Sequence, residues 1–271
     1  MNGLIARIAI AVTAVFMLSG CASGYSQYYE PNNAMLGSPI GVDLSPGATP
    51  TVIASSGDAK IDTLSLYSQG LGLLGSSSFN GANEGAAGAI GQAKKIGATH
   101  IVMSAQYART VSGAIPMTVP TTTTSYTSGT ATAYGAGGYA SGNYSGTTTT
   151  YGSQTTMVPY SVDRYDQSAG YFAPLKRRGY GMMQMPLAED QVRLIGSNKG
   201  MFIAAVRRGS PAFLADILPG DFILSINGQP VYDEETFAAA TAWGRPLILQ
   251  LWRNGATLEK KMAVAADGSW Q

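Results

Sequence analysis

The sequence predicts an α+β protein. A small α/β sandwich-like domain with a hairpin insertion rich in Thr, Tyr and Gly is followed by a second, mostly β domain. Three observations predict this. Strand and helix patterns alternate between residues 51 and 107, residues 121 to 156 contain no charged residue, and turn signals separate apolar runs between residues 200 and 264. The 271 residues are enough for two ordinary domains.

Composition excludes several classes of function. The net charge is +1 and only 12% of the residues are charged, so no basic face for nucleic acid is expected. One cysteine cannot form an internal disulfide, and one histidine without a second cysteine cannot build a zinc site. The acidic residues are scattered, without metal-binding spacing. We therefore expect no metal and no cofactor.

The first 20 residues, Met1 to Gly20, are typical of a signal peptide. Arg7 precedes an apolar run over residues 8–18, which is too short to span a membrane comfortably. Leu18-Ser19-Gly20-Cys21 then resembles the lipobox of bacterial lipoproteins. The resemblance implies acylation of Cys21, cleavage just before it, and attachment to a lipid bilayer. The alternative is an ordinary secretory signal that happens to contain a cysteine.

The residues after Cys21 indicate where the chain is held. Ala22 stands where, in the lipobox family, an Asp would retain a lipoprotein at the inner membrane. Its absence favours the outer membrane of a Gram-negative cell envelope, on the periplasmic side. Residues 21–33 predict a polar lipidated tether that lifts a domain roughly 20 Å from the bilayer.

Residues 34–173 predict the α/β domain. Thr51–Ser55 and Leu71–Gly75 have the composition of short strands. Residues 84 to 96 predict a helix, with small apolar residues at helical spacing and Gly97 placed to end it. Thr99–Tyr107 alternates apolar and polar residues, which favours a strand.

The uncharged stretch 121–156 predicts a long hairpin with two Thr-rich arms and a mobile Gly-rich tip near residues 135–146. Such a ribbon has a poorly fixed register and exposed edges. Self-association or contact with envelope material is the functional interpretation. A tolerated surface insertion is the alternative.

The last hundred residues contain the most specific pattern. Gly209-Ser210-Pro211-Ala212 predicts the start of a short helix, with Ser210 as cap. A Pro-Gly-Asp turn at 219–221 precedes an apolar strand and the turn Asn227-Gly228. Residues 233–242 predict an amphipathic helix, and residues 247–253 and 257–264 predict a hairpin around Asn254-Gly255.

This order of motifs resembles the PDZ domain of HtrA-type periplasmic proteases. The resemblance covers residues 174–265, leaves 266–271 as a tail, and implies a partly open β-barrel with two helices. The helix after the loop at 178–182 would span residues 187–195, and the next strand residues 200–206. Asp216 stands where the family usually has Gly, at a position of positive φ that Asp tolerates better than most residues. Uncharacterised bacterial lipoproteins with a Thr/Tyr/Gly insertion and a terminal PDZ domain are similar in arrangement.

The PDZ resemblance also implies a peptide site. A carboxylate-binding loop would comprise Arg178, Gly179, Tyr180, Gly181 and Met182. Amide groups there would form an anion-binding concavity, and Gly181 would let the backbone approach the carboxylate. A peptide would add to the strand after this loop as an extra strand, in a groove lined by Met183, Gln184, Met185, Phe237, Ala240 and Thr241. Arg177 and Arg178 either favour a terminal carboxylate or form a solvated basic patch.

No catalytic arrangement accompanies this module. The nucleophile signature of the trypsin-like HtrA protease domain is absent, and the single histidine, His100, falls in a predicted strand. We therefore expect a membrane-anchored, non-catalytic receptor for C-terminal or extended segments of envelope proteins. The alternatives are a self-assembling envelope scaffold, a PDZ domain whose groove binds nothing, and an enzyme that uses the α/β domain as a cleft.

Overall fold

The computed structural model describes residues 22–241 and 243–271, which form two compact units. The first unit comprises the described residues up to Tyr107 together with Tyr165–Gln271, and the second comprises Ala108–Arg164. The predicted signal peptide and Cys21 lie outside the described residues. In the part of the chain that the structure describes, no helix is long and apolar enough to cross a membrane.

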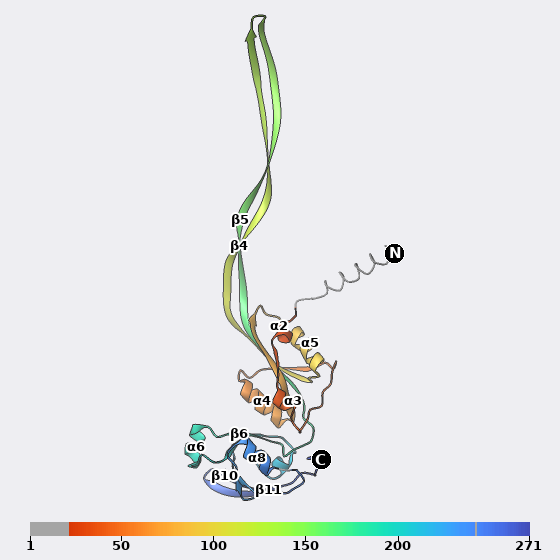
Figure 1. Cartoon of the computed structure of the whole chain (residues 1–271), viewed down its shortest axis with the longest axis vertical. Coiled ribbons are helices and arrows are strands. Elements are labelled where there is room, and N and C mark those ends of the chain that lie inside the picture. Colours follow the sequence, from red (N-terminus) through yellow and green to blue (C-terminus); the bar gives the residue numbers. More distant parts are fainter. Residues whose placement is uncertain (1–21, 242) are drawn as a thin grey trace, which may run out of the picture. The chain divides into compact units, whose positions relative to one another are not determined.

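A five-stranded sheet organises the first half of the chain (Figure 1). Its strand order is β1-β3-β5-β4-β2. β1 and β5 are antiparallel to β3, whereas β2 runs parallel to β4. The elements in chain order are α2 (Gly24–Gln27), β1 (Tyr29–Pro31), α3 (Asn33–Leu36), β2 (Thr51–Ala54), α4 (Ala59–Ser68), β3 (Leu71–Gly81), α5 (Ala86–Ile96), β4 (His100–Gly135) and β5 (Gly138–Pro174).

The two faces of this sheet carry separate apolar clusters. Successive strand residues point to opposite faces, so Ile101 packs with α2 and α5, whereas its neighbour Val102 packs with α4. The predicted helix over 84–96 is confirmed as α5, and Gly97 ends it in the left-handed conformation with φ +80°. Its small residues allow close packing: a Cβ on Gly88 would lie 2.0 Å from the hydroxyl of Ser23.

The predicted tether over residues 21–33 is wrong for its described part. Residues from Ser23 onward form α2 and β1, and Tyr25 is completely buried. The carboxylate of Glu84 accepts hydrogen bonds from the Gly24 N–H and the Ser23 hydroxyl, so it compensates the amide groups at the start of α2. A tyrosine that appeared to belong to a solvated linker is therefore part of the core.

α4 is a helix that the sequence pattern does not predict. Asp58 caps this helix by accepting hydrogen bonds from the N–H groups of Lys60 and Ile61. Its apolar residues do not make one clean stripe, because Leu64, Leu66 and Tyr67 face two different clusters. A helix that contacts a sheet on one side and another domain on the other lacks simple amphipathic periodicity.

The second unit is a two-stranded ribbon formed by β4 and β5 (Figure 1). Side-chain hydrogen bonds join Thr110 to Asp163, Thr118 to Thr155 and Thr130 to Asn143. All three pairs fit one register without a shift. The strands turn at residues 136–137, so the connection is shorter than the predicted Gly-rich tip near 135–146. The ribbon is also longer than the predicted insertion at 121–156.

The C-terminal part is built on a second sheet of order β11-β10-β8-β7-β6, with β9 paired to β8. Its core contains Ile203, Ile223 and Leu249, which are completely buried. The elements are β6 (Met182–Pro186), α6 (Glu189–Ile195), β7 (Met201–Val206), α7 (Pro211–Leu214), β8 (Phe222–Ile226), β9 (Gln229–Pro230), α8 (Glu234–Ala240), β10 (Leu247–Arg253) and β11 (Ala256–Met262).

Most local predictions for this part are confirmed. Ser210 caps α7, with Pro211 at its first position. Asp216, Asn227 and Asn254 have positive φ, of 57°, 50° and 50°. These residues accept the left-handed conformation more readily than most, so the turns lie where the sequence indicates them.

An apolar cluster and a pair of hydrogen bonds join the two sheets of the first unit. An apolar cluster combines Tyr67 of α4, Leu175 and Ala205 of β7, with Met35 and Ile40 packed against it. Beside it, the Arg207 guanidinium donates hydrogen bonds to the carbonyls of Leu175 (2.7 Å) and Lys176 (2.6 Å). The α/β part and the C-terminal part therefore belong to one compact unit.

Candidate functional site

Two glycines shape the loop between β5 and β6. Gly179 and Gly181 both have φ of +74°, which side-chain-bearing residues rarely adopt. A Cβ on Gly181 would also lie 2.2 Å from the Cβ of Ser210. The resemblance to PDZ domains implies that this glycine permits the close approach of a ligand. The structure gives a different reason, which is positive φ combined with tight packing against Ser210.

Two carbonyl groups fix the orientation of this loop. The Tyr180 carbonyl accepts a hydrogen bond from the Ala212 N–H (3.0 Å), and the Gly181 carbonyl accepts one from the Arg207 N–H (2.8 Å). In a planar trans peptide the N–H points opposite to the carbonyl. The N–H groups of Gly181 and Met182 therefore point away from the turn at residues 207–212. Successive N–H groups on one side of a loop can hold an anion.

This loop, β6 and α8 line a cavity of about 550 Å³, within the usual range for ligand sites. Most of the predicted site residues line it: Gly179, Tyr180, Gly181, Met182, Met183, Gln184, Phe237 and Thr241. They come from elements far apart in the sequence. The structure thus brings the predicted loop and most of the predicted groove to one cavity.

Three predicted residues do not line the cavity. Met185 is paired with Phe202 in the ladder between β6 and β7. Ala240 packs against the core of the C-terminal part. Arg178 forms an ion pair with Asp267 at 4.0 Å. Hydrogen bonds from Ser269, together with the Arg178 charge, lower the pKa of the Asp267 carboxyl. Arg178 therefore belongs to a surface contact and not to the lining of the groove.

The predicted tail, residues 266–271, is packed against the fold. Ser269 pairs with Arg178, and Trp270 packs against the C-terminal core. The guanidinium groups of Arg177 and Arg207 lie 5.9 Å and 4.8 Å from the centre of the Trp270 ring, within range of cation–π attraction. Arg177 also does not line the cavity, so neither arginine before the loop is placed to meet a carboxylate there.

The cavity is apolar and nearly uncharged. Tyr180, Met182 and Phe237 are only 6–8% exposed, and burial raises the pKa of the Tyr180 phenol. Among the described residues that line it, Glu234 is the single charged side chain. A carboxylate in this cavity would therefore be held by backbone N–H groups, with no lysine or arginine among the lining residues.

One edge of β6 is open. β6 is the last strand of its sheet and pairs with β7 along Met182–Pro186. No other described strand pairs with it. An unpaired edge offers N–H and C=O groups to an additional strand. The register shifts between Met183 and Gln184, which bends the strand locally.

Sequence reasoning missed one wall of the cavity. Residues of the α/β part complete the lining, namely Asn32, Ala34, Met35, Ser38, Pro39, Ile40 and Tyr67, together with Trp243. Most of them fall in a polar, Pro-containing stretch without a strand or helix pattern. Their role depends on packing between distant segments, and no local signal in the sequence indicates it.

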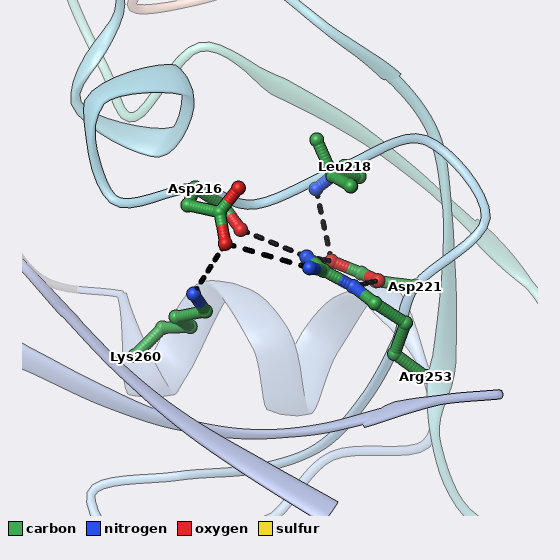
Figure 2. Close-up of polar contacts among 5 residues, drawn as sticks. All are labelled: Asp216, Leu218, Asp221, Arg253 and Lys260. Atoms are coloured by element: carbon green, nitrogen blue, oxygen red, sulfur yellow. Dashed lines mark hydrogen bonds and ion pairs between the residues drawn. The ribbon is translucent and has the colours of Figure 1, made fainter. Parts of the chain in front are cut away.

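A buried ion pair stabilises the C-terminal part away from this cavity (Figure 2). The Asp221 carboxylate, 1% exposed, accepts hydrogen bonds from Arg253 at 2.6 and 2.8 Å and from the Leu218 N–H at 2.9 Å. Asp216 lies between Arg253 and Lys260 (Figure 2). Removing one partner of such a pair typically costs about 3–5 kcal/mol. The Asp of the Pro-Gly-Asp motif therefore has a structural role.

The single histidine has a local contact. His100 is half-buried at the start of β4, and its Nδ1 lies 2.8 Å from the Thr99 hydroxyl. Within the described ranges, no group of three or more His, Cys, Asp or Glu side chains could hold a metal ion.

Comparisons with known proteins agree with the second half of this fold. Residues 202–253 match the PDZ domain family. A curated relative, a "Probable serine protease do-like" of Buchnera aphidicola subsp. Acyrthosiphon pisum (strain APS), is 40% identical over 62 residues, which is 22% of this chain and 13% of the relative. The chain thus spans only a small fraction of that relative's length.

Solved structures of HtrA-type proteins are also similar to this chain. The HtrA3 PDZ domain bound to a phage-derived ligand is 26% identical, with 32% of this chain and 83% of that chain covered and a TM-score of 0.30. The HtrA-type protease AlgW with decapeptide is 24% identical, with 36% of each chain covered and a TM-score of 0.28. The family match and the curated relative identify the C-terminal part as a PDZ domain of the HtrA type.

Proposed function

We propose that this chain, whose C-terminal part is a PDZ domain of the HtrA type, is a membrane-anchored receptor for peptide segments of envelope proteins. One observation carries the proposal. The unpaired edge of β6 borders an apolar cavity that Gly181 and Met182 also line, and the N–H groups of these two residues point away from the turn at 207–212. A peptide would add to β6 as a strand, and its terminal carboxylate would accept hydrogen bonds from these N–H groups.

Labelled octapeptides that differ only in the last residue (Ala, Val, Leu, Phe or Asp) test this function. Each is titrated against the full chain in detergent, with a free and with an amidated C-terminus. We expect an apolar last residue with a free carboxylate to bind at least about tenfold more tightly than its amide, because a hydrogen-bonded charge contributes about 1.5–3 kcal/mol. Absence of binding to every peptide would refute the proposal.

The anchor is the lipidated thiol of Cys21, which lies outside the described residues. The folded chain supports a close attachment, since α2 is already capped by Ser23. A lipid on Cys21 would then hold the α/β part near the bilayer, instead of on a tether of about 20 Å. Several acyl chains together would make the attachment lasting, and Ala22 favours the outer membrane, with the receptor on the periplasmic side.

The receptor is proposed to be non-catalytic. The similarity to the serine protease relative extends over 62 residues, which is 13% of that relative. His100, the single histidine, contacts a threonine hydroxyl. Incubating the full chain with unfolded casein tests this part of the proposal. We expect no fragments, and cleavage that persists in a His100→Ala variant would indicate a catalytic site elsewhere.

A second candidate function is self-association through the ribbon Ala108–Arg164. Residues 110 to 162 contain no charged side chain, so identical copies would meet without charge repulsion. An isolated two-stranded hairpin is marginally stable in water and gains from further pairing. Tyr126, Tyr134 and Tyr151 are 69–81% exposed along it.

Shortening the ribbon separates the two functions. Residues 122–135 and 138–151 oppose one another in the observed register, so their joint deletion keeps the turn at 136–137 and the pairing below it. We expect the shortened chain to associate more weakly in analytical ultracentrifugation, because it loses the outer part of the uncharged ribbon, and to keep its peptide affinity. Unchanged association would confine the contact to the base of the ribbon, residues 108–121 and 152–164.

A further inference from the structure

The PDZ cavity has a wall that does not belong to the PDZ domain. The α3 wall comprises residues 32–40, that is Asn32, α3 and the turn after it. Asn32, Ala34, Met35, Ser38, Pro39 and Ile40 line the same cavity as Tyr180, Met182 and Phe237. The groove therefore opens onto another part of the same chain.

Both ends of the α3 wall are fixed to the α/β part. At its start, the Asn32 N–H donates to the Leu74 carbonyl (2.8 Å), and the Asn32 side-chain amide donates to the Leu73 carbonyl (3.0 Å). At its end, the Gly41 N–H closes a turn onto the Ser38 carbonyl, and Val42 pairs with Leu175. A short segment held at both ends has little conformational freedom to lose when a ligand binds.

The α3 wall meets the PDZ domain at two points. Met35 and Ile40 pack against the buried cluster that includes Ala205 of β7, and Met183 of β6 packs against the same cluster. Ile40 also lies against the carboxylate-binding loop, since a Cβ on Gly179 would be 3.4 Å from Ile40 Cγ1. Among the described residues, no hydrogen bond joins the α3 wall to β6. The backbone groups at the open edge of β6 are therefore not used by the α3 wall and can pair with a peptide.

We propose that the α3 wall is the second wall of the peptide groove and determines the ligand's specificity. This proposal rests on the proposed function. It adds which residues form the side of the groove that faces the α/β part. Ile40 limits the space for the last side chain, because it sits beside the loop that would hold the carboxylate. Met35, Met182 and Met183 give an apolar, adaptable lining. The preferred ligand is a chain end with a small apolar last residue such as Val.

Two substitutions in α3 provide a matched test. Ala34 is exposed and lines the cavity, whereas Leu36 on the same helix is 45% exposed and does not line it. In the full chain, Ala34→Trp should weaken binding of the octapeptide ending in Val at least tenfold, whereas Leu36→Trp should change it less than twofold. Equal affinities of the Ala34→Trp variant and the unsubstituted chain would overturn the proposal.

A specificity ratio gives a second measurement that is insensitive to partial unfolding. The Ile40→Ala variant removes side-chain volume beside the loop, so the affinity ratio of the Phe-ending to the Val-ending octapeptide should rise about fivefold, with Leu36→Ala as control. An unchanged ratio would overturn the role of Ile40. If the unsubstituted chain binds no peptide at all, the proposed function itself fails, and this outcome differs from binding that ignores the α3 wall.

Discussion

At the scale of single residues, the site depends on backbone geometry more than on side-chain charge. Gly179 and Gly181 take positive φ, and two carbonyls tied to the turn at 207–212 orient the N–H groups of Gly181 and Met182. Arg178 contacts Asp267, and Arg177 lies over the Trp270 ring. Recognition of a carboxylate here would thus rely on preorganised amide groups, which lose little freedom on binding.

Gly181→Ala should abolish peptide binding and destabilise the PDZ domain. The alanine at position 181 would have to adopt a positive φ, and its Cβ would collide with Ser210. Gly228→Ala is the matched control, because Gly228 also has positive φ (80°) but no atom within 4 Å of the added Cβ. Strain alone costs about 1 kcal/mol, so we expect Gly181→Ala to lose at least about 2 kcal/mol more in urea unfolding. Equal losses would contradict the packing described for the loop.

Ionisation of the buried Tyr67 phenol should lower the stability of the protein at alkaline pH. Burial raises the pKa of its phenol from 10.0 to about 12. The neutral form is favoured in the fold, so the full stability is present below pH 10 and is lost as the pH rises toward 12. This shift corresponds to roughly 3 kcal/mol. Urea unfolding at pH 9 and pH 12 should show a smaller loss for Tyr67→Phe, and identical losses would contradict the burial of this phenol between α4 and β7.

At the scale of elements, helices and strands could be predicted where capping and turn residues mark their ends. Gly97, the Ser210-Pro211 cap and the two Asn-Gly turns mark their positions directly, and α5 and the C-terminal hairpin follow from them. α4 was missed because its apolar residues face two clusters. The sequence predicts a linker after Cys21 because no residue near this segment indicates that it folds. The carboxylate that accepts a hydrogen bond from the first N–H group of α2 belongs to Glu84, which is distant in the sequence.

The candidate site was predictable to the same extent. The loop at 178–182 and the groove strand follow from sequence motifs, because a PDZ domain forms them from contiguous residues. The α3 wall does not, because Met35 and Ile40 reach the cavity only through packing of the α/β part on the PDZ domain. Side-chain roles such as that of Arg178 also depend on distant partners, here Asp267.

The ribbon has two different faces near its base. In the observed register, Ile115 lies opposite Val158 on one face, with Met117, Val119, Tyr160 and Val162 nearby. Thr118 and Thr155 lie on the other face, where their hydroxyls are 3.0 Å apart. Ile115, Met117 and Val119 are 47–58% exposed. An exposed apolar stripe of this kind usually marks an interaction surface.

Charges on the two faces should act differently. Ile115→Asp with Val158→Asp places two carboxylates in the apolar stripe and should weaken self-association at least tenfold, because each would be desolvated in the contact. Thr118→Asp with Thr155→Asp adds the same charge to the opposite face and should leave association within about threefold. Sedimentation at several concentrations measures both. A reversed order would assign the contact to the threonine face.

At the scale of the whole molecule, the α/β part and the PDZ domain act as one body. The Arg207 bonds to Leu175 and Lys176 and the cluster around Tyr67 join them, so the groove and α2 belong to one compact unit. The lining of the cavity accordingly includes residues from both parts.

Cys21→Ala should release the protein from membranes. The substitution removes the single thiol of the chain, and with it the acyl chains that would anchor it. Fractionation after an alkaline wash should find most of the unsubstituted protein in the membrane pellet and most of the variant in the supernatant. Equal retention of both would show that another feature holds the protein there.

The most direct test of peptide capture at β6 is residue-resolved amide NMR of the chain with and without the Val-ending octapeptide. Our account expects the largest shift changes at the N–H groups of Gly181 and Met182, together with new hydrogen-exchange protection along the free edge of β6. If the peptide binds while these amides keep their shifts and exchange rates, the groove between β6 and α8 is not the binding site.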